Sequence, residues 1–189
     1  MNTAMPPLET ERLRVRPFVE DDLSAVAAIL ETEGTDATTE RYVRHGGLSA
    51  EVLAALRQPP LGDRAVVLRA TGEVVGLAGL VPAYGPFEQL RPLGKTSVDP
   101  PRMAPYRIEI GLFYHVHPAH RGQGFATEAA RALAAFAFER LLLGRIVATT
   151  AHANAASIAV MRHLGMRLHE NASGQPPWFQ VAGILDRPR

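Results

Sequence analysis

The amino-acid sequence predicts a single α/β domain in which a mixed sheet carries helices on both faces. The chain has 189 residues, of which 47% are hydrophobic, which is enough for one domain with a sizeable core. Segments with strand-like alternation and segments with helical spacing follow one another, and the second half runs strand, helix, strand, helix. No internal repeat and no break in composition divides the chain, so we expect residues 1–189 to form one domain.

The first two elements are expected close to the N-terminus. Leu13 to Arg16 alternates apolar and charged residues, which is typical of a short, half-exposed strand. Asp21 and Asp22 then precede an apolar-periodic helix, Leu23 to Leu30, and place acids where a helix N-terminus favours them.

A second helix and a hairpin follow. Ser49 is expected to cap a helix from Ala50 to Arg57, which a pair of prolines stops. Ala65 to Ala70 and Val74 to Val81 are rich in strand-forming residues, and the Thr-Gly pair between them marks a turn. From Pro82 to Tyr106 the chain is rich in proline and glycine without a period, which predicts a functional loop or a mobile flap.

The second half contains the clearest helix of the chain. After a long strand, Arg107 to His117, a helix is expected with one apolar stripe at helical spacing, formed by Phe125, Ala129, Leu133, Phe136 and Ala137. Ile146 to Thr150 is expected as a strand. Asn154 to Leu164 is expected as a helix that Gly165 ends, and Trp178 to Leu185 as a terminal strand.

Composition excludes several classes of function. The net charge of +1 gives no general electrostatic argument for nucleic acid or an anionic membrane as partner. The absence of cysteine excludes disulfides, thiolate zinc sites and a cysteine nucleophile. The start, MNTAMPPLETE, lacks the basic and apolar regions of a secretory signal, and no apolar run approaches the length of a membrane span. We therefore expect a cytoplasmic protein.

The most informative segment is a glycine-rich loop between the long strand and the strong helix. Glycines let the backbone turn tightly and approach a ligand, and the first turn of a helix presents unpaired N–H groups. With the helix dipole, this makes an anion site suited to a pyrophosphate. The segment consists of Arg121, Gly122, Gln123, Gly124, Phe125, Ala126 and Thr127.

Three kinds of ligand-binding loop have a glycine-rich turn of this type. A nucleotide P-loop needs Gly-Lys-Ser/Thr at its end, which is absent. A dinucleotide-binding loop needs a small residue where Thr127 stands and an acid about twenty residues on, but Ile146 to Thr150 contains none. The pattern Gln/Arg-x-x-Gly-x-Gly/Ala is met by Arg121, Gly124 and Ala126. A glycine-rich turn without a ligand is the remaining alternative.

The surrounding sequence resembles the coenzyme A-binding core of the GNAT superfamily of N-acetyltransferases. The similarity runs from Glu109 to Leu133 and continues in Arg145–Ala148, Asn154–Ile158 and Leu164–Met166. The opening, Leu8 to Phe18, is similar to the branch that contains the ribosomal-protein N-terminal (alanine/serine) acetyltransferases. The resemblance implies six or seven mostly antiparallel strands flanked by about four helices.

The resemblance also implies an activity and a cosubstrate. It identifies the chain as an N-acetyltransferase that moves the acetyl group of acetyl-CoA directly to a primary amine, without a metal. Backbone N–H groups around Gln123 to Thr127 would hold the pyrophosphate. The strand ending near Val116 would pair with the pantetheine arm, and a main-chain N–H there would polarise the acetyl carbonyl. Asn154 and Ser157 would face the cofactor.

Direct transfer needs a neutral amine, a route for its proton, stabilisation of the oxyanion and sometimes an acid for the thiolate. Asn154 and Ser157 are three residues apart at a helix start, so their side chains lie close together. In the resembling branch a serine at this place protonates, or hydrogen-bonds to, the departing sulfur. Alternatively, Asn154 merely caps the helix and Ser157 is a neutral first-turn residue.

Glu109 is the candidate base or base relay, because it starts the strand expected to border the acceptor. This strand is two residues longer than the family's Glu-Ile-Gly-Tyr version, which puts Gly111 at the family's acid position. Positions 109 and 111 share a strand face unless a bulge intervenes. A solvated glutamate at a sheet edge is the alternative.

Three histidines follow on the same strand and loop: His115, His117 and His120. No acid or cysteine completes a ligand set with them, so we expect no metal. His117 is a second candidate for a general base at neutral pH.

The acceptor stays open between a protein N-terminus, a free amino acid or polyamine, and an aminoglycoside-like drug, because the family varies its acceptor walls. We expect the segment from Pro82 to Tyr106 to close over the acceptor or over a partner subunit, with a disordered insert as the alternative, and we leave a homodimer open. The alternative function is a catalytically silent domain that binds acetyl-CoA as a sensor or regulator. Asn154 and Ser157 favour the enzyme.

Overall fold

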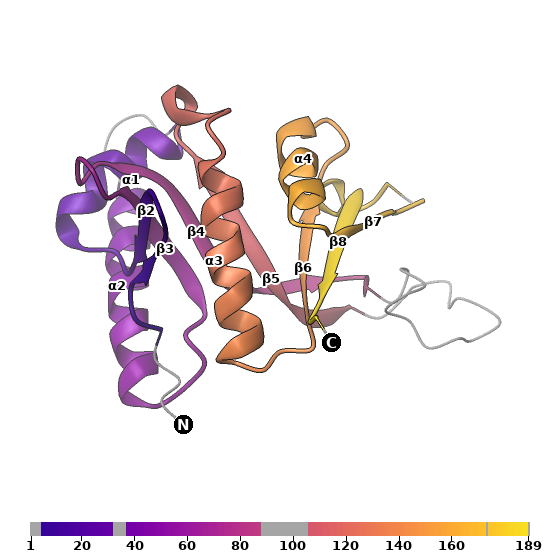
Figure 1. The fold of residues 1–189 in the computed structure, drawn as a ribbon, viewed down its shortest axis with the longest axis horizontal. Coiled ribbons are helices and arrows are strands. Elements are labelled where there is room, and N and C mark those ends of the chain that lie inside the picture. The colour runs from indigo at the N-terminus through magenta and orange to yellow at the C-terminus, as the bar shows by residue number, and fades with distance from the viewer. Residues whose placement is uncertain (1–4, 32–36, 88–105, 173, 189) are drawn as a thin grey trace. The chain divides into compact units, whose positions relative to one another are not determined.

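A computed structural model describes residues 5–31, 37–87, 106–172 and 174–188 (Figure 1). The described elements are β1 (Leu8–Glu9), β2 (Leu13–Arg16), α1 (Leu23–Ile29), α2 (Ala37–Ala55), β3 (Gly62–Leu68), β4 (Val74–Gly85), β5 (Arg107–Val116), α3 (Phe125–Glu139), β6 (Arg145–Thr150), α4 (Ala155–His163), β7 (Arg167–Glu170) and β8 (Val181–Asp186). Short 3-10 turns precede α1, α3 and β8.

The strands pair in the order β1-β2-β3-β4-β5-β6-β8-β7. Antiparallel registers join β1–β2, β2–β3, β3–β4, β6–β8 and β7–β8, whereas β5 and β6 are parallel, with Gly111 opposite Val147. The expected mixed, mostly antiparallel sheet with about four helices is confirmed. The described sheet has eight strands because it includes β1 and β7, which are too short and too polar to show alternation in the sequence.

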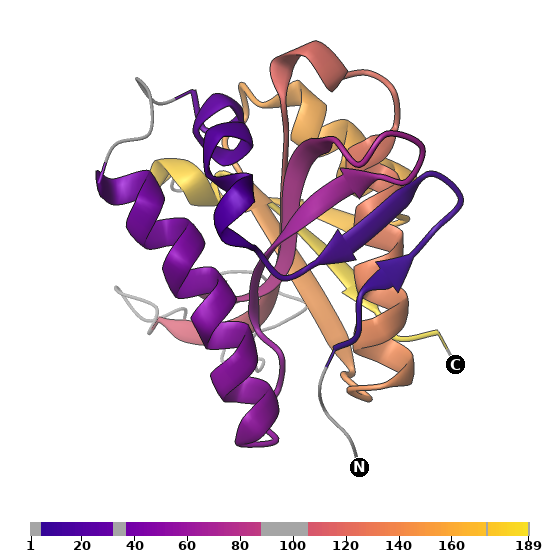
Figure 2. The same ribbon diagram turned by 90° about the vertical axis from the view of Figure 1, so that its left-hand side faces the viewer.

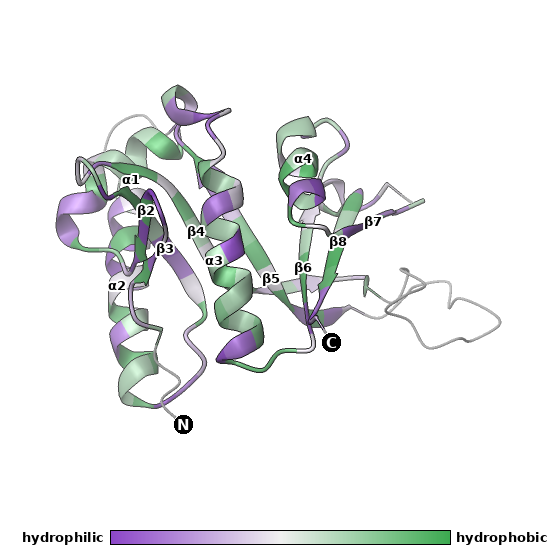
Figure 3. Ribbon diagram, viewed as in Figure 1, coloured by the Kyte–Doolittle hydropathy of each residue, from purple (hydrophilic) through white to green (hydrophobic). Residues whose placement is uncertain are grey.

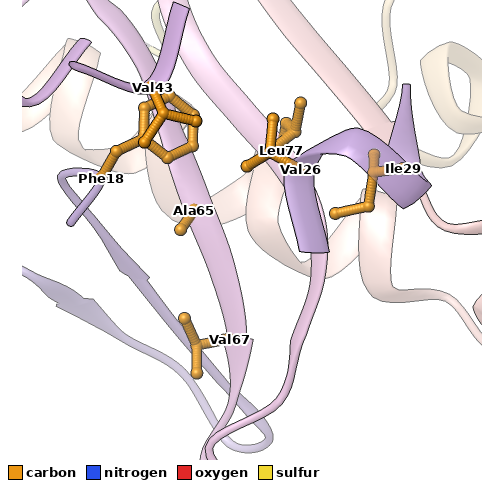
Figure 4. Packing of buried hydrophobic residues seen from close by; sticks show 7 residues of the cluster. All are labelled: Phe18, Val26, Ile29, Val43, Ala65, Val67 and Leu77. Atoms are coloured by element: carbon orange, nitrogen blue, oxygen red, sulfur yellow. The ribbon is translucent and has the colours of Figure 1, made fainter. Parts of the chain in front are cut away.

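The chain forms two compact units, residues 1–81 with 112–143 and residues 82–111 with 144–189. In the first unit α1 and α2 cover one side of the strands and α3 the other (Figures 1 and 2). The core beneath α1 and α2 is a cluster from both helices, two strands and the chain before α1 (Figure 4). Its buried members are Phe18, Val26, Ile29, Val43, Ala65, Val67 and Leu77.

The prediction of a short second helix capped by Ser49 is wrong. Helix α2 spans Ala37–Ala55, and Ser49 lies inside it. The helix runs through Gly46 and Gly47, which serve close packing against Phe18. A Cβ on Gly46 would lie 2.6 Å from the Phe18 ring, and a Cβ on Gly47 would lie 3.0 Å from the Phe18 carbonyl oxygen. Tertiary packing therefore outweighs the low helix propensity of glycine here.

The second unit is built around β6, β7 and β8, with α4 contacting β6 and β7. Its core joins a residue just after β4 to residues of β6, the last 3-10 turn and β8. The buried members are Phe87, Val147, Phe179, Ala182 and Ile184. The terminal strand starts later than expected, at Val181, because Pro177–Phe179 forms a 3-10 turn. In Figure 3 hydrophobic residues are frequent along the strands near the middle of the sheet, whereas each helix has both hydrophobic and hydrophilic residues.

The long proline- and glycine-rich segment is only partly described. Strand β4 continues to Gly85, beyond the expected end at Val81, and Tyr84 packs against Tyr106 with ring centroids 4.9 Å apart. Residues 88–105 lie outside the described part of the chain, and with them most of the predicted loop.

Candidate active site

The glycine-rich loop is exposed and adopts a backbone that favours glycine. Gly122 and Gly124 have φ angles of 78° and 82°, the left-handed region. An added Cβ on Gly122 would meet nothing within 4 Å, and one on Gly124 would meet only the Arg12 guanidinium, at 3.5 Å. The backbone at Gly122 is therefore open to solvent, and the Arg12 guanidinium lies beside Gly124.

The first turn of α3 supplies the donors. Gly124 is the N-cap, no side chain caps the helix, and the first bond back along the helix runs from Glu128 N–H to the Gly124 carbonyl at 3.0 Å. The N–H groups of Phe125, Ala126 and Thr127 precede that bond, so the helix geometry leaves them without a helical acceptor. Together with the positive end of the helix dipole they form an anion-binding backbone.

Arg121 ties this loop to its surroundings. Its Nε donates to the Val116 carbonyl at 3.1 Å, and its Nη2 donates to Glu31 at 2.8 Å. Val116 is the last residue of β5, and a Cβ on Gly76 of β4 would lie 3.4 Å from the Val116 Cα. The end of β5 is thus held between the backbone of β4 and the Arg121 side chain.

A second arginine reaches the loop from the N-terminus. Arg12 donates from Nη1 to the Gln123 carbonyl at 3.0 Å and from Nε to Glu128 at 2.7 Å. Thr10 adds a hydroxyl bond of 2.6 Å to the same carboxylate. Burial raises the pKa of Glu128, but the hydrogen bonds from Thr10 and Arg12 outweigh it and hold the pKa below its ordinary value. Sequence reasoning missed these contacts, because the partners are 116 and 118 residues apart.

The predicted catalytic pair lies at the start of α4, in the second unit. The Asn154 side-chain oxygen accepts a bond of 3.0 Å from the Ser157 backbone N–H. Asn154 is exposed and Ser157 half-buried. The bond joins the Asn154 side chain to the Ser157 backbone, which is the capping role that was the alternative for Asn154. The catalytic roles of the two residues stay predictions.

Glu109 lies in β5, in the second unit, and both of its carboxylate oxygens are engaged. Arg145 of β6 donates to them from Nε at 3.0 Å and from Nη2 at 2.5 Å. The hydrogen bond to Glu109 is the main reason that the pKa of Arg145 lies above its ordinary value. The pair joins β5 to β6 two residues before their registered position, Gly111 opposite Val147.

The three histidines have different partners. His117 accepts a bond of 3.2 Å from Ala119 N–H and caps the 3-10 turn, and His120 lies 2.9 Å from Glu73. Burial, aided by the charge of Arg121, lowers the pKa of His115. Among residues 5–31, 37–87, 106–172 and 174–188, no three histidine, aspartate or glutamate side chains gather as a metal site would require.

An exposed glycine loop at the start of a helix, set after a strand of a mixed sheet, can bind a pyrophosphate through its backbone N–H groups. The sequence model of the Acetyltransferase (GNAT) domain matches residues 12–167, and the chain belongs to this family. The resemblance seen in the sequence is thereby confirmed, and the protein is an acetyl-CoA-dependent acetyltransferase.

Individual relatives agree with this assignment. The chain is 27% identical over 164 residues to the uncharacterized N-acetyltransferase YnaD of Bacillus subtilis, covering 85% of this chain and 82% of that protein. An acetyltransferase structure from Agrobacterium tumefaciens has a TM-score of 0.67 at 24% identity, with 97% and 95% of the two chains covered. RimL, a ribosomal L7/L12 alpha-N-protein acetyltransferase in complex with coenzyme A, has a TM-score of 0.60 at 14% identity, with 96% and 98% covered. These two likenesses concern the fold.

Within the described part of the chain, none of the helices combines the length and the apolar character that a membrane crossing demands.

Proposed function

We propose that the protein transfers the acetyl group of acetyl-CoA to a primary amine, either a protein N-terminus or a small molecule, in the cytoplasm, with residues 1–189 acting as one N-acetyltransferase domain. The observation that carries the proposal is the exposed loop at Gly122 and Gly124, whose uncapped helix start offers backbone N–H groups to a pyrophosphate. The structural likeness to RimL, which was solved with coenzyme A, supports coenzyme A as part of the cosubstrate.

In this proposal the glycine-rich loop and the end of β5 bind different parts of acetyl-CoA. The backbone from Gly122 to Thr127, together with the charge of Arg121, binds the pyrophosphate. The main chain at Val116 pairs with the pantetheine arm, and a main-chain N–H there stabilises negative charge on the acetyl oxygen. When bound, acetyl-CoA supplies an activated thioester, whose C–S bond breaks as the C–N bond to the amine forms.

Two protons have to move during the transfer. The attacking amine loses one, for which we propose Glu109 as the base or base relay, and the leaving thiolate gains one, for which we propose the Ser157 hydroxyl. Asn154 orients the start of α4, because its side chain already accepts the Ser157 N–H. The ion pair with Arg145 gives Glu109 a structural role in addition.

A thiol-release assay tests the activity. Purified protein with acetyl-CoA is offered peptides with free N-termini, amino acids, polyamines and aminoglycosides, and we expect release of coenzyme A with one of these classes. Ser157→Ala should lower kcat more than it raises the KM for acetyl-CoA. Binding of acetyl-CoA without turnover on any amine would instead favour a sensor or regulator.

Calorimetry tests the cosubstrate site separately. Gly124→Glu places a bulky anion where the pyrophosphate is proposed, and we expect it to abolish acetyl-CoA binding. Gly165→Glu is the matched control, because Gly165 has a φ of 77° and open space around its Cβ position, and so carries the same backbone strain. Unchanged binding in a folded Gly124→Glu protein would contradict the phosphate-loop assignment.

A further inference from the structure

We propose that Arg12 and Glu128 are positioning residues of the cosubstrate loop: Arg12 holds the Gln123 carbonyl, and thereby aims the Gly124 N–H at the pyrophosphate. This inference rests on the proposed function, and it assigns a role to the N-terminal segment, which the glycine-loop pattern does not include.

The guanidinium of Arg12 contacts several partners at once. Nε and Nη2 contact one oxygen of Glu128 at 2.7 and 2.6 Å, and Nη1 donates to the Gln123 carbonyl at 3.0 Å. The guanidinium carbon also lies 4.7 Å from the centroid of the buried Phe125 ring, within the range of a cation–π contact. A planar group with this many partners has one orientation, so it holds the carbonyl at a defined place.

Glu128 fixes the arginine in turn. Its second oxygen accepts the Thr10 hydroxyl at 2.6 Å and the Arg12 backbone N–H at 2.9 Å. The Glu128 side chain is 17% exposed, and its lowered pKa keeps it ionised at neutral pH. The turn between β1 and β2 is therefore docked onto the first turn of α3 by a carboxylate that uses both oxygens.

The consequence for the loop follows from peptide geometry. The Gln123 carbonyl and the Gly124 N–H belong to one trans peptide plane and point in opposite directions. A carbonyl drawn toward Arg12 therefore turns the Gly124 N–H away from it. Because glycine populates both signs of φ, the 123–124 peptide is able to flip if nothing holds it. Arg12 selects the orientation that is seen, with Gly124 at a φ of 82°.

Charge balance supports the same role. A carboxylate in the first turn of α3 would repel a pyrophosphate bound to that turn, and Arg12 neutralises it at contact distance. The pair as a whole adds no net charge. We therefore expect its contribution to come from the orientation of the loop and from removal of this repulsion.

The test compares two nearby arginines, Arg12 just before β2 and Arg14 within it. Arg12→Gln removes the clamp, whereas Arg14→Gln is the matched control, since Arg14 pairs with Glu9 at 2.6 Å and makes no contact with the loop in the described part of the chain. We expect Arg12→Gln to weaken acetyl-CoA binding about tenfold or more in calorimetry, the loss of a charge-assisted hydrogen bond and its geometry. Arg14→Gln should bind as the wild type does.

A truncated ligand separates positioning from general damage. S-acetylpantetheine lacks the pyrophosphate, so its affinity in ligand-observed NMR should be the same for Arg12→Gln and the wild type. Arg12→Lys should recover part of the acetyl-CoA affinity. If Arg12→Gln does not fold, Arg12→Lys takes its place: it keeps the charge but loses the forked contact with Glu128 and the Gln123 carbonyl, so it should weaken acetyl-CoA binding in the same direction.

Three results would overturn the inference. The first is wild-type acetyl-CoA affinity in Arg12→Gln, or in Arg12→Lys where that variant replaces it. The second is an equal loss of affinity for Arg12→Gln and Arg14→Gln, and the third is an equal loss of affinity for S-acetylpantetheine. A wild-type protein that binds no acetyl-CoA would overturn the proposed function itself, so the two failures are distinguishable.

Discussion

Glu109→Gln removes the negative charge that Arg145 grips and keeps the size and shape of the side chain. The Glu109 side chain is 13% exposed and the Arg145 side chain 34%, so the ion pair is neither fully buried nor fully at the surface. A hydrogen bond to a charged group contributes about 1.5–3 kcal/mol when buried, and an exposed ion pair about 0–1 kcal/mol. For this half-buried pair we expect a loss of about 1–2 kcal/mol in the free energy of unfolding. The melting temperature should fall by about 3–6 °C.

Arg145→Met separates the structural role of Glu109 from its proposed role in proton transfer. It breaks the same ion pair but leaves the Glu109 carboxylate in place, and a largely buried charge without its partner should cost at least as much stability. Urea unfolding measures the stability, and steady-state kinetics with the identified amine measure kcat. We expect only Glu109→Gln to lower kcat, by about a hundredfold or more, as for the loss of a general base.

Two outcomes would refute this reasoning. Equal values of kcat in Glu109→Gln and Arg145→Met would remove Glu109 from proton transfer and leave it as an anchor between β5 and β6. Wild-type stability in both variants would show that the ion pair, despite its geometry, does not hold these strands together.

Two further predictions concern stability. Burial raises the pKa of Asp63 against the opposing hydrogen bond from Tyr42 at 2.7 Å, so the native protein binds a proton more readily there than the unfolded chain does. The bound proton therefore stabilises the native state below about pH 4, the ordinary pKa of aspartate, and this stabilisation is lost as the pH rises through the native pKa. Asp63→Asn should abolish that fall in the free energy of unfolding, measured in urea at several pH values. An unchanged fall in the variant would contradict the assignment to Asp63. Gly79→Ala would place a Cβ 2.8 Å from the Asp63 Cα and against the Gly62 carbonyl, which should cost about 2–3 kcal/mol. Gly144→Ala, with open space around the new Cβ, should stay within about 0.5 kcal/mol of wild type in the same measurement, and equal losses would refute the steric argument.

Local patterns in the sequence predicted the elements whose signals are local. The helix after Gly124 and the hairpin of β3 and β4 were expected from periodicity and turn residues, and their existence and order are confirmed. Helix α2 was expected too short, because Ser49 is of a residue type that favours helix N-caps, whereas the folded helix runs through Gly46 and Gly47, which pack against Phe18. No spacing rule places Phe18 there, since the contact forms only in the folded core.

In the candidate site too, the local features were predictable from the sequence and the long-range contacts were not. The loop at Gly122 and Gly124 was predicted from composition and position, and both residues have the positive φ that makes glycine necessary. The partners of the side chains were not predictable. Arg12 reaches Glu128 across 116 residues, and Arg145 meets Glu109 across 36. Such pairs depend on which strands and helices become neighbours, which periodicity does not encode. The roles proposed for Glu109 and Ser157 remain predictions.

The path of the chain through the two units limits how this protein can be divided. One unit takes residues 1–81 and 112–143, and the other takes 82–111 and 144–189, so the chain enters each unit twice. A cut after residue 81 leaves the first unit without α3, and a cut after residue 143 leaves the second without β4's end and β5's start. No single cut yields two complete units. Fragment complementation, inserted domains and circular permutants therefore have to keep all three crossings between the units intact. We expect the chain to be inherited and exchanged as one piece.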